Sequence, residues 1–322
     1  MTIPTNTYTR VTAANNVRED LIDKITLTNK WMTPVISASG KATAEQTYHE
    51  WQRDSYRAAN KDSAALDGDD ATASAKTPPS RVANNCQIFQ DTISVSGRAE
   101  RVKKAGMKSA MAYYKAKAYK EIQRDMEAMV VSKNVSVADN GTLAGKSAGL
   151  GRLIYTNISH GGSGATPAHT SGAATSAITA GTNRTFTVTL LNAAVQATYI
   201  ACSEVPGQVF MSPSHKAIFS TFTGIAANRL DVKNKDQGRI VSGADVYVSD
   251  FGAMEIVPHY LMAGSDVVYG LNTDYIDVAY LRGFQSKELA KTGDSEREQC
   301  LVDATLRVTS EVAQWKIDNL TP

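Results

Sequence analysis

The sequence predicts an α+β fold in which one long helix lies against strands from distant parts of the chain. A proline-free stretch of good helix formers covers residues 98–131. Runs typical of strands dominate from residue 265 to the C-terminus, and two more flank a polar loop at 60–80. At 322 residues the chain can form one large domain or two ordinary ones.

The stretch 98–131 is the element around which the rest of the chain is arranged. At 1.5 Å per residue, a helix of this length forms a rod of about 50 Å. Its apolar residues recur at steps of three and four and form one stripe: Met107, Met111, Tyr114, Ala118, Ile122, Met126 and Met129. We expect this helix to be buried against the strands in 299–315 through five of them: Met107, Tyr114, Ala118, Ile122 and Met126.

The same stretch is rich in positive charge. On a continuous helix seven of its nine basic residues fall into two rows on roughly opposite sides. One row is Arg101, Lys104, Lys108 and Lys115, and the other is Lys117, Lys120 and Arg124. Such rows are often a solvated surface, but they also suit contact with an acidic partner, whether a neighbouring subunit, a scaffold or nucleic acid.

The N-terminal residues read as an arm without a core of its own. Asn16 is expected to cap a short amphipathic helix over 17–24. Further on, Pro34 disfavours a simple helix, while Trp31 and Val35 need cover from another part of the molecule.

Residues 47–96 predict a long hairpin. Its loop, 60–80, is composed of Asp, Ala, Ser, Gly and Pro with almost nothing to bury, and 81–95 returns as a strand. Ordering an arm that projects from any core costs conformational entropy. We therefore expect the arm to lie on a neighbouring subunit.

The second half of the chain alternates loops with short elements. Residues 132–151 and 160–181 read as loops, and 186–202 as a helix whose inward residues are Leu190, Ala194, Ala197 and Ile200. The remaining expectations are a buried strand at 208–211, a helix opened by Ser212 and Pro213, and a hairpin over 240–259.

The sequence holds no recognisable catalytic constellation, so we expect neither an enzyme nor a cofactor or metal. The three cysteines lack metal-ligand spacing, and the five histidines, His49, His160, His169, His215 and His259, are isolated. A net charge of +2 argues against a strongly basic nucleic-acid binder. No apolar run is long enough for a membrane span.

Five segments spread over almost the whole chain carry a resemblance to a known family. They are HEWQRDS (49–55), NNCQIFQDTISVSG (84–97), MSPSHKAIF (211–219), YIDVAYLRGF (275–284) and ELAKTGDSEREQCLVDATL (288–306). With these segments the chain resembles the major capsid proteins of tailed bacteriophages.

The resemblance implies the tailed-phage major capsid protein fold and a division of the chain into five parts. These are an N-terminal arm (1–46), an extended β-hairpin loop (47–96), a peripheral domain with the long spine helix (97–147), an axial domain (148–260) and the return strands of the peripheral domain (261–322).

The function implied is structural. The subunit would self-assemble into pentamers and hexamers of an icosahedral capsid around double-stranded DNA, in the host cytoplasm and without a membrane. Its other partners would be a separate scaffold or decoration protein and, non-specifically, the packaged DNA. Two alternatives stay open: the shell of a cargo-enclosing nanocompartment with the same fold, and a nucleic-acid-binding protein that uses the basic helix.

Overall fold

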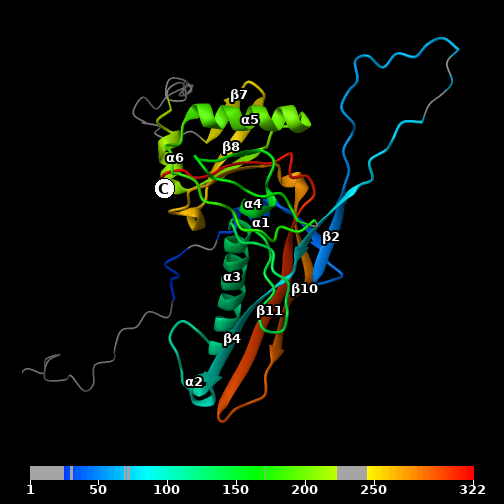
Figure 1. Cartoon of the computed structure of the whole chain (residues 1–322). Coiled ribbons are helices and arrows are strands. Elements are labelled where there is room, and N and C mark those ends of the chain that lie inside the picture. Colours follow the sequence, from blue (N-terminus) through cyan, green and yellow to red (C-terminus); the bar gives the residue numbers. More distant parts are fainter. Residues whose placement is uncertain (1–24, 30–31, 69, 71–72, 171, 223–244) are drawn as a thin grey trace, which may run out of the picture.

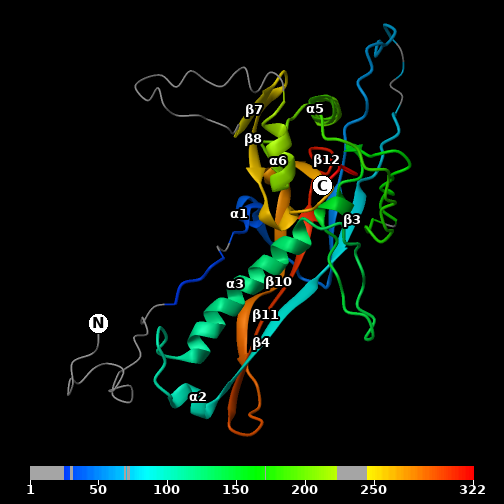
Figure 2. The ribbon, with the colours of Figure 1, turned by 90° about the vertical axis from the view of Figure 1, so that its left-hand side faces the viewer.

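The computed structural model describes residues 25–29, 32–68, 70, 73–170, 172–222 and 245–322. The predicted helix over 17–24 and the predicted burial of Trp31 lie outside these residues. Figures 1 and 2 show an elongated part built on helix α3 (Ala110–Val130), a second part that carries helix α5 (Val188–Cys202), and a hairpin that projects away from both.

The elongated part pairs α3 with a sheet of four described strands in the order β1-β10-β11-β4. Strand β10 (Ile276–Glu288) lies between β1 (Gly40–Thr43) and β11 (Ser295–Val308). Strand β4 (Gln87–Ser96) closes the sheet beside β11. β1 runs parallel to β10, and the other neighbours are antiparallel. Because these strands come from three distant parts of the sequence, the sheet forms only when the whole chain folds.

The second part is a mixed sheet of six described strands in the order β5-β12-β9-β6-β8-β7. Their bounds are β5 (Ile158–Ser159), β12 (Trp315–Ile317), β9 (Val268–Leu271), β6 (Gln208–Met211), β8 (Gly252–Pro258) and β7 (Val246–Ser249). Helices α5 and α6 (Pro213–Phe219) share a separate apolar core with this sheet, centred on Phe186, Leu191, Phe219 and Trp315.

Most local predictions for this part are confirmed. The buried strand at 208–211 is β6, and the hairpin expected within 240–259 is β7 with β8. Ser212 caps α6 by accepting a hydrogen bond from the N–H of His215. The predicted inward face of α5 is partly wrong. Ile200 is 75% exposed, and the buried face runs through Leu191, Ala194, Val195 and Thr198.

The predicted continuous helix over 98–131 is wrong. A short helix, α2 (Gly97–Arg101), ends before residues 102–109, and α3 begins only at Ala110. Gly106 in this link has a φ of 76°, which interrupts a right-handed helix. Ser109 then caps α3, and the Glu100 carboxylate accepts a hydrogen bond (2.9 Å) from the N–H of Ala110.

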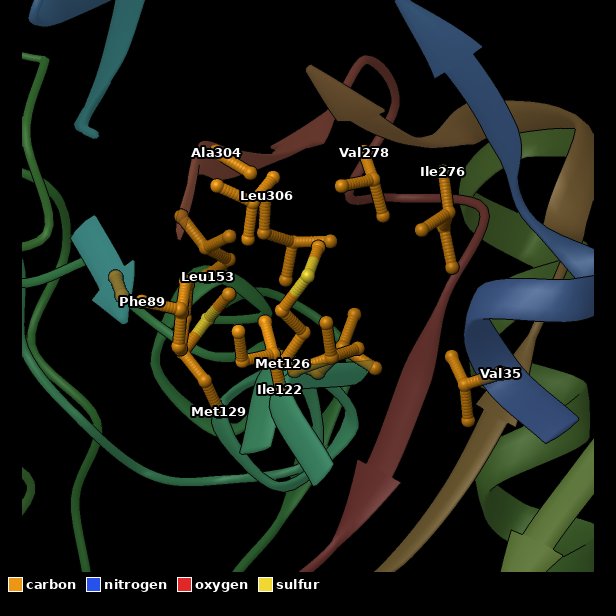
Figure 3. Close-up of a cluster of buried hydrophobic side chains, with 14 of the residues drawn as sticks. Val35, Phe89, Ile122, Met126, Met129, Leu153, Ile276, Val278, Ala304 and Leu306 are labelled. Atoms are coloured by element: carbon orange, nitrogen blue, oxygen red, sulfur yellow. The ribbon is translucent and has the colours of Figure 1, made fainter. Parts of the chain in front are cut away.

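The predicted buried stripe of α3 is confirmed in its C-terminal half. Ala118, Ile122 and Met126 are each 1% exposed. Figure 3 shows Ile122, Met126 and Met129 of this helix facing the sheet across one core. The other residues labelled there are Val35 of α1 (Pro34–Ala38), Phe89 of β4, Ile276 and Val278 of β10, Ala304 and Leu306 of β11, and Leu153. Leu153 belongs to the short helix α4 (Leu150–Leu153).

The prediction fails toward the N-terminal end of α3. Tyr114 is 43% exposed, and Met107 lies in the link before the helix and is only partly buried. Lys115, one position further, contacts Glu298 of β11 in place of Tyr114. The side of α3 that meets the sheet is therefore displaced by one residue here, and Met111 and Tyr119 pack at the edge of the core.

Two further elements differ from the sequence predictions. Pro34 does not prevent a helix but starts one, α1 (Pro34–Ala38), at a position where its missing N–H costs nothing. The prediction of a single return strand over 81–95 is wrong, because this stretch forms two strands that are separated at Cys86. Its first half, β3 (Ser80–Asn85), pairs with β2 (Tyr48–Arg53), whereas the second half is β4 in the large sheet.

Candidate assembly surfaces

The most prominent surface feature is the connection between β2 and β3. Strand pairing ends at Arg53 and Ser80, and every described residue from 54 to 79 is exposed. Among them are two large apolar side chains, Tyr56 (104% exposed) and Leu66 (80%). Figures 1 and 2 show this segment extending well beyond the body of the subunit. We name residues 54–79 the projecting loop.

The base of the projecting loop is held firmly. The indole N–H of Trp51 donates to the carbonyl oxygen of Val308 at 2.9 Å. The Arg53 guanidinium donates to the Tyr155 hydroxyl at 2.7 Å and lies 3.6 Å from the Glu311 carboxylate. The loop therefore leaves the body from a fixed position, although its own residues have no core.

Buried Asn84 holds the other strand of the hairpin. Its amide nitrogen donates to the carbonyl of Leu306 (2.8 Å) and to Ser147, and its amide oxygen accepts from the N–H of Ala148. One side chain thus joins β3 to β11 and to the segment before α4.

The first predicted basic row does not exist as a helical row, because the helix is broken. Arg101 ends α2, Lys104 and Lys108 lie in the link, and only Lys115 is on α3. Lys104 is 3.6 Å from the Glu100 carboxylate. Lys115 forms a short ion pair with Glu298, and this hydrogen bond raises the pKa of Lys115 and lowers the pKa of Glu298. Arg101 and Lys108 are exposed.

The second predicted row is brought together on one face of α3. Lys117, Lys120 and Arg124 line a pocket of about 310 Å³ with Glu121 and with the apolar surfaces of Leu27, Tyr113 and Ala116. Lys117 and Glu121 form an i,i+4 ion pair at 3.5 Å. Arg124 lies over the ring of Tyr260, 5.9 Å from its centroid. We name this hollow the α3 pocket.

A buried carboxylate joins the two parts of the subunit. Glu127, fully buried near the end of α3, accepts hydrogen bonds from the N–H groups of Val35 (2.7 Å) and Ile36 (2.9 Å) at the start of α1. It also lies 2.8 Å from Nε2 of buried His259, which directly follows β8. This side chain fixes the inner end of the N-terminal arm to α3 and to the second sheet.

A second polar network lies beyond the end of α3. Lys133 bridges Asp266 (2.7 Å) and the fully buried Asp318 (2.5 Å). Burial opposes the charge on Asp318, but the hydrogen bond and charge of Lys133 outweigh it and lower the pKa of that carboxyl. Nearby Lys316 is fully buried, and burial lowers its pKa to about 7.

Neither network is predicted by the sequence pattern, although one signal was present. Glu127 lies within the apolar run that ends α3, between Met126 and Met129, on the face predicted to be buried. A charged residue at such a position needs a partner, because an unpaired buried charge is costly. Its partner His259 could not be identified, since 132 positions separate the two residues.

The described residues contain no group of three or more side chains suited to hold a metal ion. Cys86, Cys202 and Cys300 are free thiols. No helix in the described part of the chain has both the length and the apolar character needed to cross a bilayer. The notable features are therefore the projecting loop, the α3 pocket and the buried joints between the parts.

Comparison with known families decides the identity. The sequence model of the SU10 major capsid protein family matches residues 3–321, which is nearly the entire chain. The chain belongs to the SU10 major capsid protein family. It is a shell-forming structural protein of a tailed bacteriophage, and the resemblance found in the sequence is confirmed.

One curated relative supports the assignment locally. The major capsid protein of Escherichia phage Phieco32 is 30% identical over 100 residues. That match covers 31% of this chain and 28% of the relative, so the chain spans well under two thirds of the relative's length in this comparison.

Capsid structures share the fold over nearly the full length. A chain of the cyanophage A-1(L) capsid asymmetric unit has a TM-score of 0.68 at 12% identity, covering 98% of this chain and 100% of that one. The capsid of an empty GTA particle gives 0.63 at 11% identity (97% and 99% covered). Mycobacterium phage Bobi gives 0.58 at 11% identity (98% and 96% covered). At such low identity these likenesses establish the fold.

Proposed function

We propose that this capsid protein assembles into pentamers and hexamers of an icosahedral shell that encloses double-stranded DNA. The observation that carries the proposal is the projecting loop, considered together with the family match. Its described residues are exposed in the isolated subunit, and they include the two large apolar side chains Tyr56 and Leu66. The conformational-entropy cost of ordering such a segment is offset only if a neighbouring subunit covers it.

The division implied by the resemblance provides a framework for this assembly. In this proposal the α3 part, with β1, β4, β10 and β11, is the peripheral domain. The α5 part, with β6 to β9, is the axial domain near the capsomer centre. Two apolar cores, one around α3 and one around α5, support two such domains. The bounds differ from the expected ones, because β9 and β12 of the α5 sheet fall within 261–322 and not within 148–260.

The test of the proposal is to produce the chain in bacteria and examine the purified product by negative-stain electron microscopy. We expect closed shells or capsomers with five and six subunits. Coexpression with candidate scaffold proteins covers the case in which the subunit needs a separate scaffold. A product that remains monomeric under all these conditions contradicts the proposal, and shells that hold protein cargo and exclude DNA favour a nanocompartment.

Contact with the packaged DNA is a second part of the proposal. We assign it to the basic residues at and after α2, Arg101, Lys104 and Lys108, of which Arg101 and Lys108 are exposed. Phosphate contacts by lysine and arginine are non-specific, as packaging and release of a genome require. Changing Lys104 and Lys108 to Glu is expected to leave shells intact and lower their DNA content. Loss of shells would assign these residues to subunit contacts.

A further inference from the structure

We propose that the buried carboxylate of Asp318 is the moving part of a pH-sensitive joint between the two parts of the subunit. Acidification shifts this carboxylate from Lys133 toward His160 and Lys316, and thereby loosens the attachment of the end of α3 to the second sheet. The joint belongs to the subunit itself, so it goes beyond the proposed function and does not depend on it.

One oxygen of Asp318 holds the joint together. The ammonium group of Lys133, just past the end of α3, lies 2.5 Å from Oδ1 of Asp318, which directly follows β12. The same ammonium lies 2.7 Å from Asp266, just before β9. The Tyr269 hydroxyl adds a hydrogen bond of 3.1 Å to the carbonyl of Val131. These bonds tie the end of α3 to both β12 and β9.

The other oxygen of Asp318 is free to accept a bond. Oδ2 is buried and has no hydrogen-bond partner among the described residues. Two nitrogens lie just beyond hydrogen-bond distance from it, Nδ1 of His160 at 3.8 Å and Nζ of Lys316 at 4.0 Å. Neither ring nitrogen of His160 has a partner in the described part of the chain. A small shift of the carboxylate toward these nitrogens therefore forms a bond that both sides lack.

The charges of these two nitrogens change with pH, whereas the charge of Asp318 does not. Burial and the nearby charge of Lys316 lower the pKa of His160 below 6.5. Burial lowers the pKa of Lys316 to about 7. Burial opposes the charge on Asp318, but Lys133 outweighs it and lowers the pKa of that carboxyl. Acidification from pH 8 to pH 5 thus adds positive charge beside a free oxygen that stays anionic.

The remaining groups around the joint keep their charges over this range. Arg184 attracts Asp318, and Arg152 opposes the charge on Lys316. Both guanidinium groups stay charged. Tyr269 stays neutral, because burial raises its pKa well above the usual value. The change in charge therefore comes from the histidine and the lysine that face Oδ2.

Unequal burial of the three partners makes the exchange feasible. The side chains of Lys133 and Asp266 are 33% and 29% exposed, whereas Asp318 is fully buried. A released Lys133 keeps Asp266 and water, but Asp318 must keep a partner inside the protein. A charged Lys316 also repels Lys133. Acid therefore attracts Asp318 to its second position and weakens the first.

The lowered pKa values fix the direction of the effect on stability. Between its folded-state pKa of about 7 and its ordinary value of 10.5, Lys316 binds a proton more readily in the unfolded chain. His160 does the same below 6.5. The contribution of both groups to stability falls as the pH falls through these ranges.

Hydrogen exchange of the full chain at pH 5 and pH 8 tests the joint. After correction for the intrinsic exchange rates, the amides of 131–134 and 316–320 should open about tenfold more often at pH 5. A tenfold change corresponds to one pKa unit. The amides of β11 report global unfolding, so the excess over them measures the joint alone.

Charge-removing variants identify the groups responsible. Lys316→Met with His160→Gln should abolish the pH response at the joint. Lys133→Met should give the same frequent opening at both pH values, because its joint is already released. Lys287→Met, at an exposed position of β10, is the matched control and should keep the full response.

A further variant covers a folding defect of the double variant. Lys316 also donates to the carbonyl of Gly151 and to the Thr166 hydroxyl, so its replacement removes two buried bonds. His160→Gln alone leaves these bonds in place and should reduce the pH response without abolishing it.

A structure determined at pH 5 shows the shift directly. Oδ2 of Asp318 should lie within about 3 Å of Nδ1 of His160, and Lys133 should have moved away from Asp318. Equal opening of the unmodified chain at both pH values overturns the proposal, as does a full response in the double variant or in His160→Gln. An unchanged position of Asp318 at pH 5 overturns it as well. These measurements hold whether or not the chain forms shells, so they stand apart from the test of the proposed function.

Discussion

Oε1 of Glu127 lies 2.8 Å from Nε2 of His259, and both side chains are fully buried. The same carboxylate accepts the backbone N–H groups of Val35 and Ile36. A residue of α3 thereby holds α1 and the end of β8 in one arrangement. This side chain thus helps to fix the orientation of the inner arm and of the second sheet relative to α3.

Replacing Glu127 with Ala should therefore destabilise the subunit strongly. The change leaves two backbone donors and the His259 ring without their acceptor inside the protein. Breaking a buried pair of this kind costs about 3–5 kcal/mol of unfolding free energy. Urea unfolding of dissociated subunits measures the loss, and Glu121→Ala, a half-buried glutamate on the same helix, serves as the control. Equal midpoints for the two variants would contradict this role of Glu127.

Ala118→Asp tests the buried face of α3. Ala118 is 1% exposed, so an aspartate there becomes an unpaired buried charge. We expect a loss of at least about 3 kcal/mol and an insoluble product. Ala112→Asp is the matched control, because Ala112 is exposed in the first turn of the same helix, where a carboxylate is favourable. A folded, assembling Ala118→Asp protein would show that another face is buried.

Removing the tip of the projecting loop should separate folding from assembly. Deletion of 62–76 removes a segment whose described residues are all exposed, and the β2–β3 pairing and the contacts of Trp51 and Arg53 remain. The melting temperature of the subunit should stay close to that of the intact chain, while electron microscopy should show no shells. Shells of normal size from the deletion would contradict assembly through the loop.

His169 should make the subunit sensitive to acid. Burial, with the charges of Arg152 and Arg53, lowers the pKa of His169 from 6.5 to about 4. Between these values the unfolded chain binds a proton that the folded chain does not, so stability falls as the pH falls from 6.5 toward 4. The pKa values of His49, His160 and His215 are also lowered and act in the same direction.

The variant His169→Gln isolates this contribution. Urea midpoints measured at several pH values between 4 and 7 should decline less steeply for the variant than for the unmodified chain. Parallel declines for the two proteins would mean that the pKa of His169 is the same in the folded and the unfolded chain.

The sequence by itself determined the elements whose signals lie among neighbouring residues. Ser212 and Pro213 start α6 through a cap and a compatible φ angle, and the β7–β8 hairpin follows its turn at 250–252. The repeat of Ala118, Ile122 and Met126 identified the buried face of α3 because helical geometry places them one turn apart. The resemblance to capsid proteins could also be recognised from the sequence, because the segments that carry it are short local patterns spread along the chain.

The tertiary structure decided what depends on residues far apart. One difference is local: the helix ends at Arg101 because Gly106, the Ser109 cap and the Glu100 carboxylate, all within ten residues of it, together outweigh the helix propensity of the link. Tyr114 is exposed because the sheet meets Lys115 at that point. The partnership of Glu127 with His259 likewise exists only in the folded chain. Helix propensity changes the free energy by less than about 1 kcal/mol per residue for ordinary residues. Leaving a buried charge without its partner costs several kcal/mol. Long-range contacts therefore decide the structure wherever the two conflict.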